Sequence, residues 1–203
     1  MPASTRLEIE GPAGSLEANM TEAEASIGVT AILCHPHPLY GGSMQDAVLE
    51  TSASVLLDHG VGCLRFNFRG VGASTGQHDK GIGEVDDLAA VHGWVSREYP
   101  DHKIWLLGYS FGANVVWRAK DALNPAHTIL VAPPVGAMEF TESTNESSVY
   151  AIAGDRDDFV KEANLQKLMV GQAHIIAGAD HFFSGHHREL VDAVGQAIAP
   201  ALR

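Results

Sequence analysis

Three kinds of residue that together carry out nucleophilic catalysis each follow an apolar segment of this sequence. Ser110 stands at the centre of the pentapeptide 108–112, which has the pattern G-x-S-x-G and comes directly after an apolar run. Three aspartates within 155–158 follow a later apolar run, and His181 follows the last one. A serine hydroxyl is a poor nucleophile near neutral pH, so it needs a base within hydrogen-bond reach, and the base needs a carboxylate to fix its tautomer. The order serine, acid, histidine therefore predicts a catalytic triad.

The segment around Ser110 has the context that a nucleophilic serine needs. Residues 104–107 predict a strand, and a helix-compatible run begins near Phe111. Glycines at 108 and 112 let the strand and the helix approach closely, so that the serine occupies the tip of a strained turn. The first free N–H groups of the helix, beginning with that of Phe111, are expected to help bind an oxyanion.

The G-x-S-x-G pattern occurs a second time, at 72–76, with Ser74 at its centre. The residues that follow it, Gln-His-Asp-Lys-Gly-Ile-Gly, are typical of a loop and cannot begin a helix. Ser74 is therefore predicted to be a turn residue. The stretch 69–76 also fails as a dinucleotide-binding fingerprint, because the third glycine would have to stand where Thr75 does, and no helix opens there.

A stiff loop with the sequence His-Pro-His-Pro-Leu-Tyr-Gly-Gly occupies positions 35–42. Its two histidines, His35 and His37, form an H-x-H pair, but further metal ligands at a recognisable spacing are missing, so a zinc site is the less favoured interpretation. We expect the loop instead to supply the second N–H of an oxyanion hole. Because the two prolines cannot donate, three residues remain as donors: His37, Leu39 and Tyr40.

Length and composition predict one globular domain, residues 1–203, because 45% of the 203 residues are hydrophobic. The chain has 25 acidic residues against 13 lysines and arginines, which gives a formal net charge of −12. Such a charge repels polyanions, so nucleic acid is not an expected partner. No apolar stretch approaches the roughly 18 residues that span a bilayer, and no signal pattern opens the chain, so we expect no membrane partner and a cytoplasmic location.

The two cysteines, Cys34 and Cys63, lie in or at the end of apolar, strand-like runs. This placement favours buried free thiols over a disulfide framework. It also agrees with a reducing compartment.

Apolar runs alternate with helix-compatible segments along most of the chain. The segments 6–10 and 15–20 predict an antiparallel hairpin. Further strands are predicted at 27–34, 63–68, 104–107, 128–132, 149–153 and 173–177, and helices at 45–58, 82–98, from 111 onward, 159–170 and 189–199. The alternation predicts an α/β fold with a mostly parallel sheet, helices on both faces, and a ligand site beyond the carboxyl ends of the strands. The acids early in the helix at 82–98 are interpreted as a solvated face: Glu84, Asp86 and Asp87.

Five blocks of sequence, in order and with sensible spacing, resemble the α/β-hydrolase superfamily, in particular its small, lidless, dienelactone-hydrolase-like members. The blocks are HPHPLYGG at 35–42, NFRGVGAS at 67–74, GYSFG at 108–112, GDRDDFV at 154–160 and DHFF at 180–183. The resemblance extends from about Ile27 to the C-terminus and implies the α/β-hydrolase fold. It implies no cap domain, because only residues 133–148 separate the strand after the elbow helix from the strand before the acids.

The resemblance also assigns roles to individual residues. The family pattern G-x-x-D-x-x-V places the acid at Asp157, with Asp155 and Asp158 as the competitors, and His181 matches the histidine of the family's D-H-F motif. Many relatives begin the oxyanion loop with His-Gly, where this chain has His-Pro; by position, His37 then becomes the expected N–H donor beside Phe111. The open mouth of the site is expected to be shaped by aromatic side chains: Tyr40, Tyr109, Phe111, Phe159, Phe182 and Phe183.

The leading hypothesis is a serine hydrolase without metal or cofactor that cleaves a carboxylic ester or similar acyl bond in a small-molecule substrate. One alternative is a catalytically silent hydrolase-fold protein that serves as a binding or interaction module. Another is metal-dependent hydrolysis through His35 and His37. Exposed parts of the N-terminal hairpin could support a homodimer.

Overall fold

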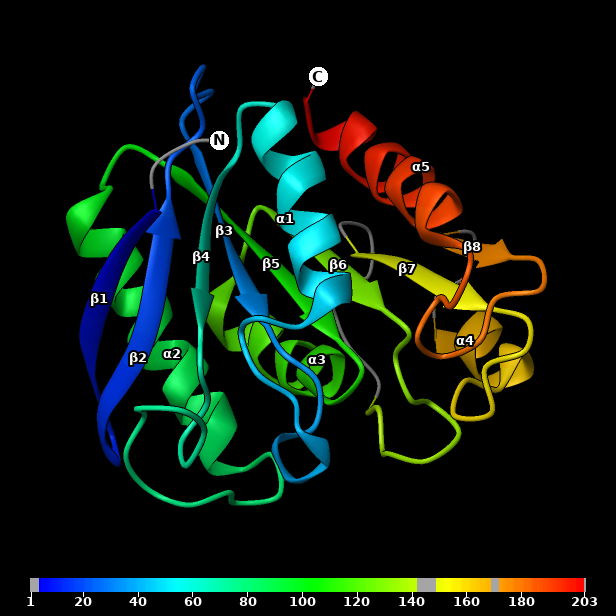
Figure 1. Ribbon diagram of the computed structural model, residues 1–203, viewed down its shortest axis with the longest axis horizontal. Coiled ribbons are helices and arrows are strands. Elements are labelled where there is room, and N and C mark those ends of the chain that lie inside the picture. The colour runs from blue at the N-terminus through cyan, green and yellow to red at the C-terminus, as the bar shows by residue number, and fades with distance from the viewer. Residues whose placement is uncertain (1–3, 142–148, 169–171, 203) are drawn as a thin grey trace.

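Eight strands form one sheet in the computed structural model, which describes residues 4–141, 149–168 and 172–202 (Figure 1). The strands are β1 (Ser4–Gly11), β2 (Gly14–Thr21), β3 (Val29–Cys34), β4 (Gly62–Phe66), β5 (Lys103–Tyr109), β6 (His127–Val131), β7 (Val149–Gly154) and β8 (Ala173–Ile176). Their order across the sheet is β1-β2-β4-β3-β5-β6-β7-β8. The hairpin β1–β2 and the pair β2–β4 are antiparallel, and every pair from β4 to β8 is parallel. The predicted fold class is confirmed.

Helices cover both faces of this sheet (Figure 1). They are α1 (Ala47–Asp58), α2 (Gly83–Glu98), α3 (Phe111–Leu123), α4 (Glu162–Leu168) and α5 (His187–Ile198), with short 3₁₀ turns at Pro38–Tyr40 and Ala199–Leu202. Apolar residues of α1 and α5 form one core with the sheet, and those of α2, α3 and α4 form a second core on the opposite face. Among the described residues, no helix is both long and apolar enough to cross a lipid bilayer.

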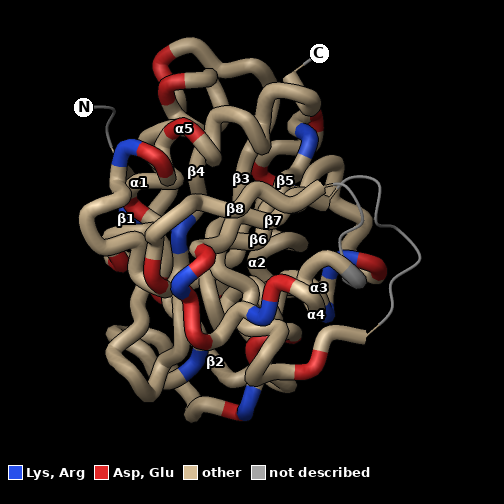
Figure 2. The backbone as a smooth tube through the Cα atoms, turned by 90° about the vertical axis from the view of Figure 1, so that its right-hand side faces the viewer, with Lys and Arg blue, Asp and Glu red and all other residues tan. Residues whose placement is uncertain are grey.

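The central strands are continuously apolar because both of their faces are covered. Every residue of β3 and of β6 is buried. Cys34 and Cys63 are buried free thiols, as predicted, and burial raises the pKa of both. On the side of the molecule that carries α4 and α5, lysine and arginine positions are interspersed with aspartate and glutamate positions (Figure 2).

The interpretation of the early acids of α2 as a solvated face is wrong for two of the three. Asp86 is exposed, but Glu84 and Asp87 are fully buried. The loop before α2 folds over the first turn of the helix, and Asp87 forms an ion pair with Arg69 at 2.7 Å. Glu84 accepts hydrogen bonds from two backbone N–H groups of the same loop, at residues 79 and 81. These acids therefore anchor the loop instead of facing water.

The helix predicted at 159–170 begins at Glu162, and its last two predicted residues lie outside the described residues, as do residues 142–148. It begins late because the Asp157 carboxylate accepts hydrogen bonds from the N–H groups of Phe159 and Val160, which form a turn at this place.

Candidate active site

Ser110 lies in a sharp turn between β5 and α3, with φ 53° and ψ −118°. Its N–H donates to the carbonyl of Val131 at the end of β6 (2.9 Å). The two flanking glycines are sterically required: a Cβ at Gly108 would lie 2.3 Å from the carbonyl oxygen of Gly112, and one at Gly112 would lie 2.2 Å from that of Cys34. The turn therefore stores backbone strain at the serine and projects its hydroxyl beyond the carboxyl end of the strand.

Two hydrogen bonds join Ser110, His181 and Asp157. The Nε2 atom of His181 lies 2.8 Å from the Ser110 Oγ, and its Nδ1 atom lies 2.7 Å from an Asp157 carboxylate oxygen. Because a carboxylate can only accept, Nδ1 carries the ring proton and Nε2 is free to accept the proton of the serine hydroxyl. The three residues follow β5, β7 and β8, whose carboxyl ends meet at one edge of the sheet.

Of the three acids in the segment 155–158, the structure brings Asp157 against the histidine. Its second carboxylate oxygen accepts the N–H of Phe159 at 2.8 Å, which fixes the orientation of the group. Asp155 is exposed and accepts the N–H of Gly178 (2.6 Å), and Asp158 is exposed.

The contacts around Ser110 leave two backbone N–H groups, those of Phe111 and His37, without a hydrogen bond among the described residues. The other donors considered in this loop are occupied: the Leu39 N–H donates to the His37 ring (3.2 Å), and the Tyr40 N–H donates to the His37 carbonyl (3.1 Å). The His37 and Phe111 rings are in contact, with centroids 4.9 Å apart. The loop after β3 thus lies directly against the turn that carries Ser110.

Exposed aromatic side chains flank this site on two sides. Phe159 and Phe182 contact the His181 ring, with centroids 4.8 and 5.5 Å away, and Tyr40 contacts the His37 ring at 4.8 Å. Their exposed fractions are 47%, 68% and 88%, respectively. All three are therefore available to a substrate.

Tyr109 does not line the mouth as expected, since it is only 1% exposed. Its hydroxyl donates to the backbone carbonyl of His181 (3.0 Å), and burial raises the pKa of that hydroxyl. Phe111 and Phe183 are buried as well. The sequence contained a signal for the burial of Tyr109, because this residue closely follows the apolar run that predicts a buried strand. Its side chain therefore holds the backbone of His181 from inside the core instead of lining the mouth.

His78 is a neighbour of the site that sequence reasoning missed. Its ring contacts those of His37 (4.9 Å) and Phe111 (5.5 Å), and its Nδ1 lies 2.8 Å from the buried Glu84 carboxylate. The His78 Nδ1 makes no hydrogen bond in the structure, in spite of this short distance. No local pattern marks His78, which lies in the glycine-rich loop and reaches the site only through the tertiary fold.

The H-x-H pair does not present two free imidazoles. Both ring nitrogens of His35 face backbone groups, of Pro36 and Phe68, and the Nδ1 of His37 accepts the N–H of Leu39. Within the part of the chain that the structure describes, no group of three or more histidine, cysteine or acidic side chains is arranged to hold a metal ion.

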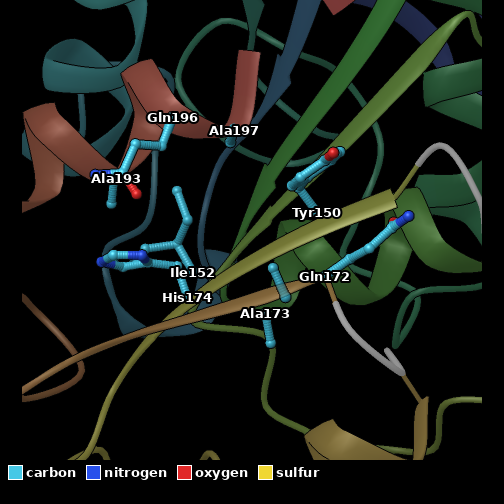
Figure 3. Close-up of a pocket in the computed structure, with 9 residues that line it drawn as sticks. Tyr150, Ile152, Gln172, Ala173, His174, Ala193, Gln196 and Ala197 are labelled. Atoms are coloured by element: carbon cyan, nitrogen blue, oxygen red, sulfur yellow. The ribbon is translucent and has the colours of Figure 1, made fainter. Parts of the chain in front are cut away.

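A separate cavity of about 210 Å³ lies between α5 and the strands β7 and β8 (Figure 3). The residues that line it are Tyr150, Ala151, Ile152, Gln172, Ala173, His174, Ala193, Gln196 and Ala197. None of the residues predicted for the site is among them. The cavity lies toward the amino ends of the two strands, whereas Ser110 lies beyond the carboxyl ends, so the cavity is not part of the arrangement around the serine.

Comparison with known proteins gives a consistent result. Residues 37–123 match the family model of the alpha/beta hydrolase fold. An uncharacterised protein of Rickettsia prowazekii is 32% identical, over 95% of this chain and 88% of its own length.

Two solved structures have the same fold and 36% sequence identity to this chain. One is an α/β serine hydrolase without a lid from Xanthomonas campestris, with a TM-score of 0.92 over 98% of this chain and 94% of that one. The other is an α/β serine hydrolase homologue from Coxiella burnetii, with a TM-score of 0.88 over 96% of this chain and 97% of that one.

Proposed function

The chain belongs to the α/β-hydrolase fold family, and we propose that it is a metal-independent serine hydrolase that cleaves a carboxylic ester or similar acyl bond. One observation carries the proposal: the His181 Nδ1–H donates a hydrogen bond to Asp157 (2.7 Å), and the Ser110 hydroxyl donates one to the His181 Nε2 (2.8 Å). They connect a nucleophile, a base and an orienting carboxylate in the arrangement that acyl transfer requires.

Catalysis then proceeds through an acyl-enzyme. His181 takes the proton of the Ser110 hydroxyl through Nε2 as the serine oxygen attacks the substrate carbonyl, while Asp157 stabilises the imidazolium. The N–H groups of Phe111 and His37 bind the tetrahedral oxyanion, each contributing about 3 kcal/mol. The C–O bond to the leaving alcohol breaks, and His181 returns the proton to that alcohol. Water, deprotonated by His181, then attacks the acyl-enzyme; the acyl C–O bond to Ser110 breaks, and His181 returns the proton to the serine oxygen as the acid is released.

The surroundings of the serine support substrates of modest size, or an acyl group that projects from a larger molecule. Within the described residues no cap domain covers the mouth. Its exposed aromatic rings, Tyr40, Phe159 and Phe182, offer apolar surface to an acyl or alcohol group. The small-molecule ester is therefore the proposed partner of this site.

Labelling by a fluorophosphonate probe, followed by intact-mass measurement, tests the proposal. We expect the wild type to gain one probe adduct and Ser110→Ala to gain none. Ser74→Ala is a matched control, because it removes the serine of the other G-x-S-x-G pentapeptide and is expected to label like the wild type. A folded wild type that does not label, or a Ser110→Ala variant that still does, would overturn the assignment and favour a binding module.

Ester hydrolysis in the presence of a chelator tests the metal independence. We expect the rate to be unchanged, because Ser110 and His181 supply the nucleophile and the base. A rate that falls with EDTA and returns with zinc would contradict the proposal and favour the metal-dependent alternative.

A further inference from the structure

His35, the first residue after β3, is fully buried and makes a hydrogen bond through each ring nitrogen. The Phe68 N–H donates to Nε2 (3.0 Å), and Nδ1 lies 2.7 Å from the carbonyl oxygen of Pro36. A backbone N–H can only donate, so Nε2 is the acceptor and Nδ1 carries the ring proton. The His35 Nδ1–H therefore donates to the Pro36 carbonyl.

The Pro36 carbonyl belongs to the same peptide unit as the His37 N–H. A trans peptide unit is planar, and its C=O and N–H point in opposite directions. A hydrogen bond that holds the carbonyl oxygen therefore also sets the direction of the N–H. In the mechanism proposed above, this N–H is one of the two donors to the oxyanion.

Further contacts fix the loop around this peptide unit. The Gly42 N–H donates to the carbonyl of His37, in the next peptide unit (3.1 Å), and Gly42 packs so closely that a Cβ there would lie 2.2 Å from the Pro36 carbonyl oxygen. The His35 ring packs on that of Phe68, with centroids 4.7 Å apart. Burial lowers the pKa of His35 to about 4, so the ring is neutral near pH 7 and keeps its acceptor for the Phe68 N–H.

We propose that His35 is a positioning residue of the hydrolytic site, which holds the Pro36–His37 peptide so that the His37 N–H faces the oxyanion. The inference rests on the proposed function. It gives the two histidines of the H-x-H pair different tasks: His37 supplies the N–H, and His35 orients it without touching the substrate. This also explains why proline is tolerated at position 36, since only its carbonyl is used.

Two substitutions separate the two hydrogen bonds of His35. His35→Gln places an oxygen near the position of Nε2, so it keeps the acceptor for the Phe68 N–H and loses the donor to Pro36. His35→Asn places an amide N–H near the position of Nδ1, so it keeps the donor and loses the acceptor. With p-nitrophenyl acetate as substrate, we expect His35→Gln to lower kcat by about 10- to 100-fold at unchanged KM. His35→Asn should lower the melting temperature more and kcat less.

A double-mutant cycle tests whether His35 acts through the His37 N–H. The φ of His37 is −58°, which fits proline, so His37→Pro removes the N–H with little strain, and His37→Ala is the control that removes only the ring. In the His37→Pro background, His35→Gln should cost no further activity, because the N–H that it positions is gone. An equal loss in both backgrounds would mean a packing role and would overturn the proposal.

A measurement on the unmodified protein gives an independent test. We expect ¹⁵N NMR of the imidazoles at pH 7 to show His35 protonated at Nδ1 and unprotonated at Nε2; the opposite tautomer would overturn the proposal. Labelling of Ser110 separates the two ways of failing. A wild type that labels, with unchanged kcat in His35→Gln, overturns the role of His35 alone, whereas a wild type that does not label overturns the proposed function as well.

Discussion

Ser74 and Ser110 each stand at the centre of a G-x-S-x-G pentapeptide, yet their hydroxyl groups have different partners. The Ser110 hydroxyl lies 2.8 Å from a ring nitrogen of His181, and its residue has a positive φ of 53°. The Ser74 hydroxyl donates to the carbonyl of Asn67 (2.7 Å) and accepts the N–H of Glu17 (2.9 Å). Ser74 is buried, and its φ is not positive.

The difference shows what the pentapeptide itself specifies. Its glycines make a tight turn in both places, but only the second turn connects a strand to a helix at the edge of the sheet where a histidine follows another strand. The first turn is fastened by the Glu17 carboxylate, which pairs with Arg6 and accepts hydrogen bonds from the Asn67 side chain and the Ala73 N–H (both 2.9 Å). A hydroxyl whose donor and acceptor are both used by the backbone has no base to activate it.

The largest expected effect tests the Ser110 side of the comparison. We expect Asp157→Asn to lower kcat by roughly 10⁴-fold, as the equivalent change does in serine proteases, because an amide favours the wrong tautomer of His181. The fold should survive, since the asparagine oxygen can still accept the N–H groups of Phe159 and Val160. Steady-state ester hydrolysis together with a thermal melt measures both quantities.

Asp155→Asn is the matched control for this change. Asp155 is exposed and accepts the Gly178 N–H, which an asparagine oxygen can also accept, so kcat should stay close to that of the wild type. A large loss of kcat in Asp155→Asn with a mild loss in Asp157→Asn would assign the catalytic acid to Asp155, against the contact between Asp157 and His181.

The next effect concerns the loop that carries Ser74. Asp87→Ala leaves the Arg69 guanidinium without its partner, although the Arg69 side chain is only 11% exposed. We therefore expect the free energy of unfolding to fall by about 3–5 kcal/mol. Asp86→Ala, one position away and exposed, should change stability little. Urea denaturation of both variants measures the difference. Equal stabilities would show that the buried ion pair does not hold the loop.

The dependence of stability on pH tests the neutral His35 imidazole. Burial lowers its pKa from the ordinary 6.5 to about 4, so below pH 6.5 the unfolded chain binds a proton that the folded chain does not. The neutral His35 contributes fully to the free energy of unfolding above pH 6.5. This contribution is lost as the pH falls from 6.5 toward 4, and it changes no further below pH 4. The total loss is on the order of 3 kcal/mol.

Other histidines with lowered pKa, His37, His92 and His127, shift stability in the same direction. The contribution of His35 is therefore measured as the difference in the free energy of unfolding between the wild type and His35→Gln, since glutamine does not titrate. Between pH 6.5 and 4, the variant should lose less stability than the wild type. Parallel curves in urea denaturation would contradict a buried neutral histidine at this position.

The sequence predicted the parts of the fold whose cause is local. Continuous apolar runs such as β3 and β6 marked strands buried on both faces, and the ends of strands marked the places from which Ser110 and His181 project. The pattern of three acids within 155–158 could not tell which one faces the histidine. That choice depends on a turn whose N–H groups are held by Asp157 itself.

The remaining differences arise from contacts between distant parts of the chain. Charged residues in the first turn of a helix are usually solvated, and nothing near Glu84 or Asp87 in the sequence shows that a loop covers them. Arg69 lies 18 positions before its partner, and its ion pair exists only in the folded chain. Tyr109 was expected at the substrate mouth, but it is the last residue of the buried strand β5, and its side chain packs beneath His181 instead of facing the mouth.

The smallest expected effect returns to Ser74. Ser74→Ala leaves the N–H of Glu17 and the carbonyl of Asn67 without partners in a buried place, so we expect a loss of about 1–3 kcal/mol in the free energy of unfolding. Activity at the assay temperature should be unchanged, because the hydroxyl lies in a turn with partners of its own. Ser110→Ala should show the opposite pattern, with activity lost and stability kept. If Ser74→Ala instead abolished ester hydrolysis in a folded protein, the partners of a serine would not suffice to decide which pentapeptide carries the chemistry.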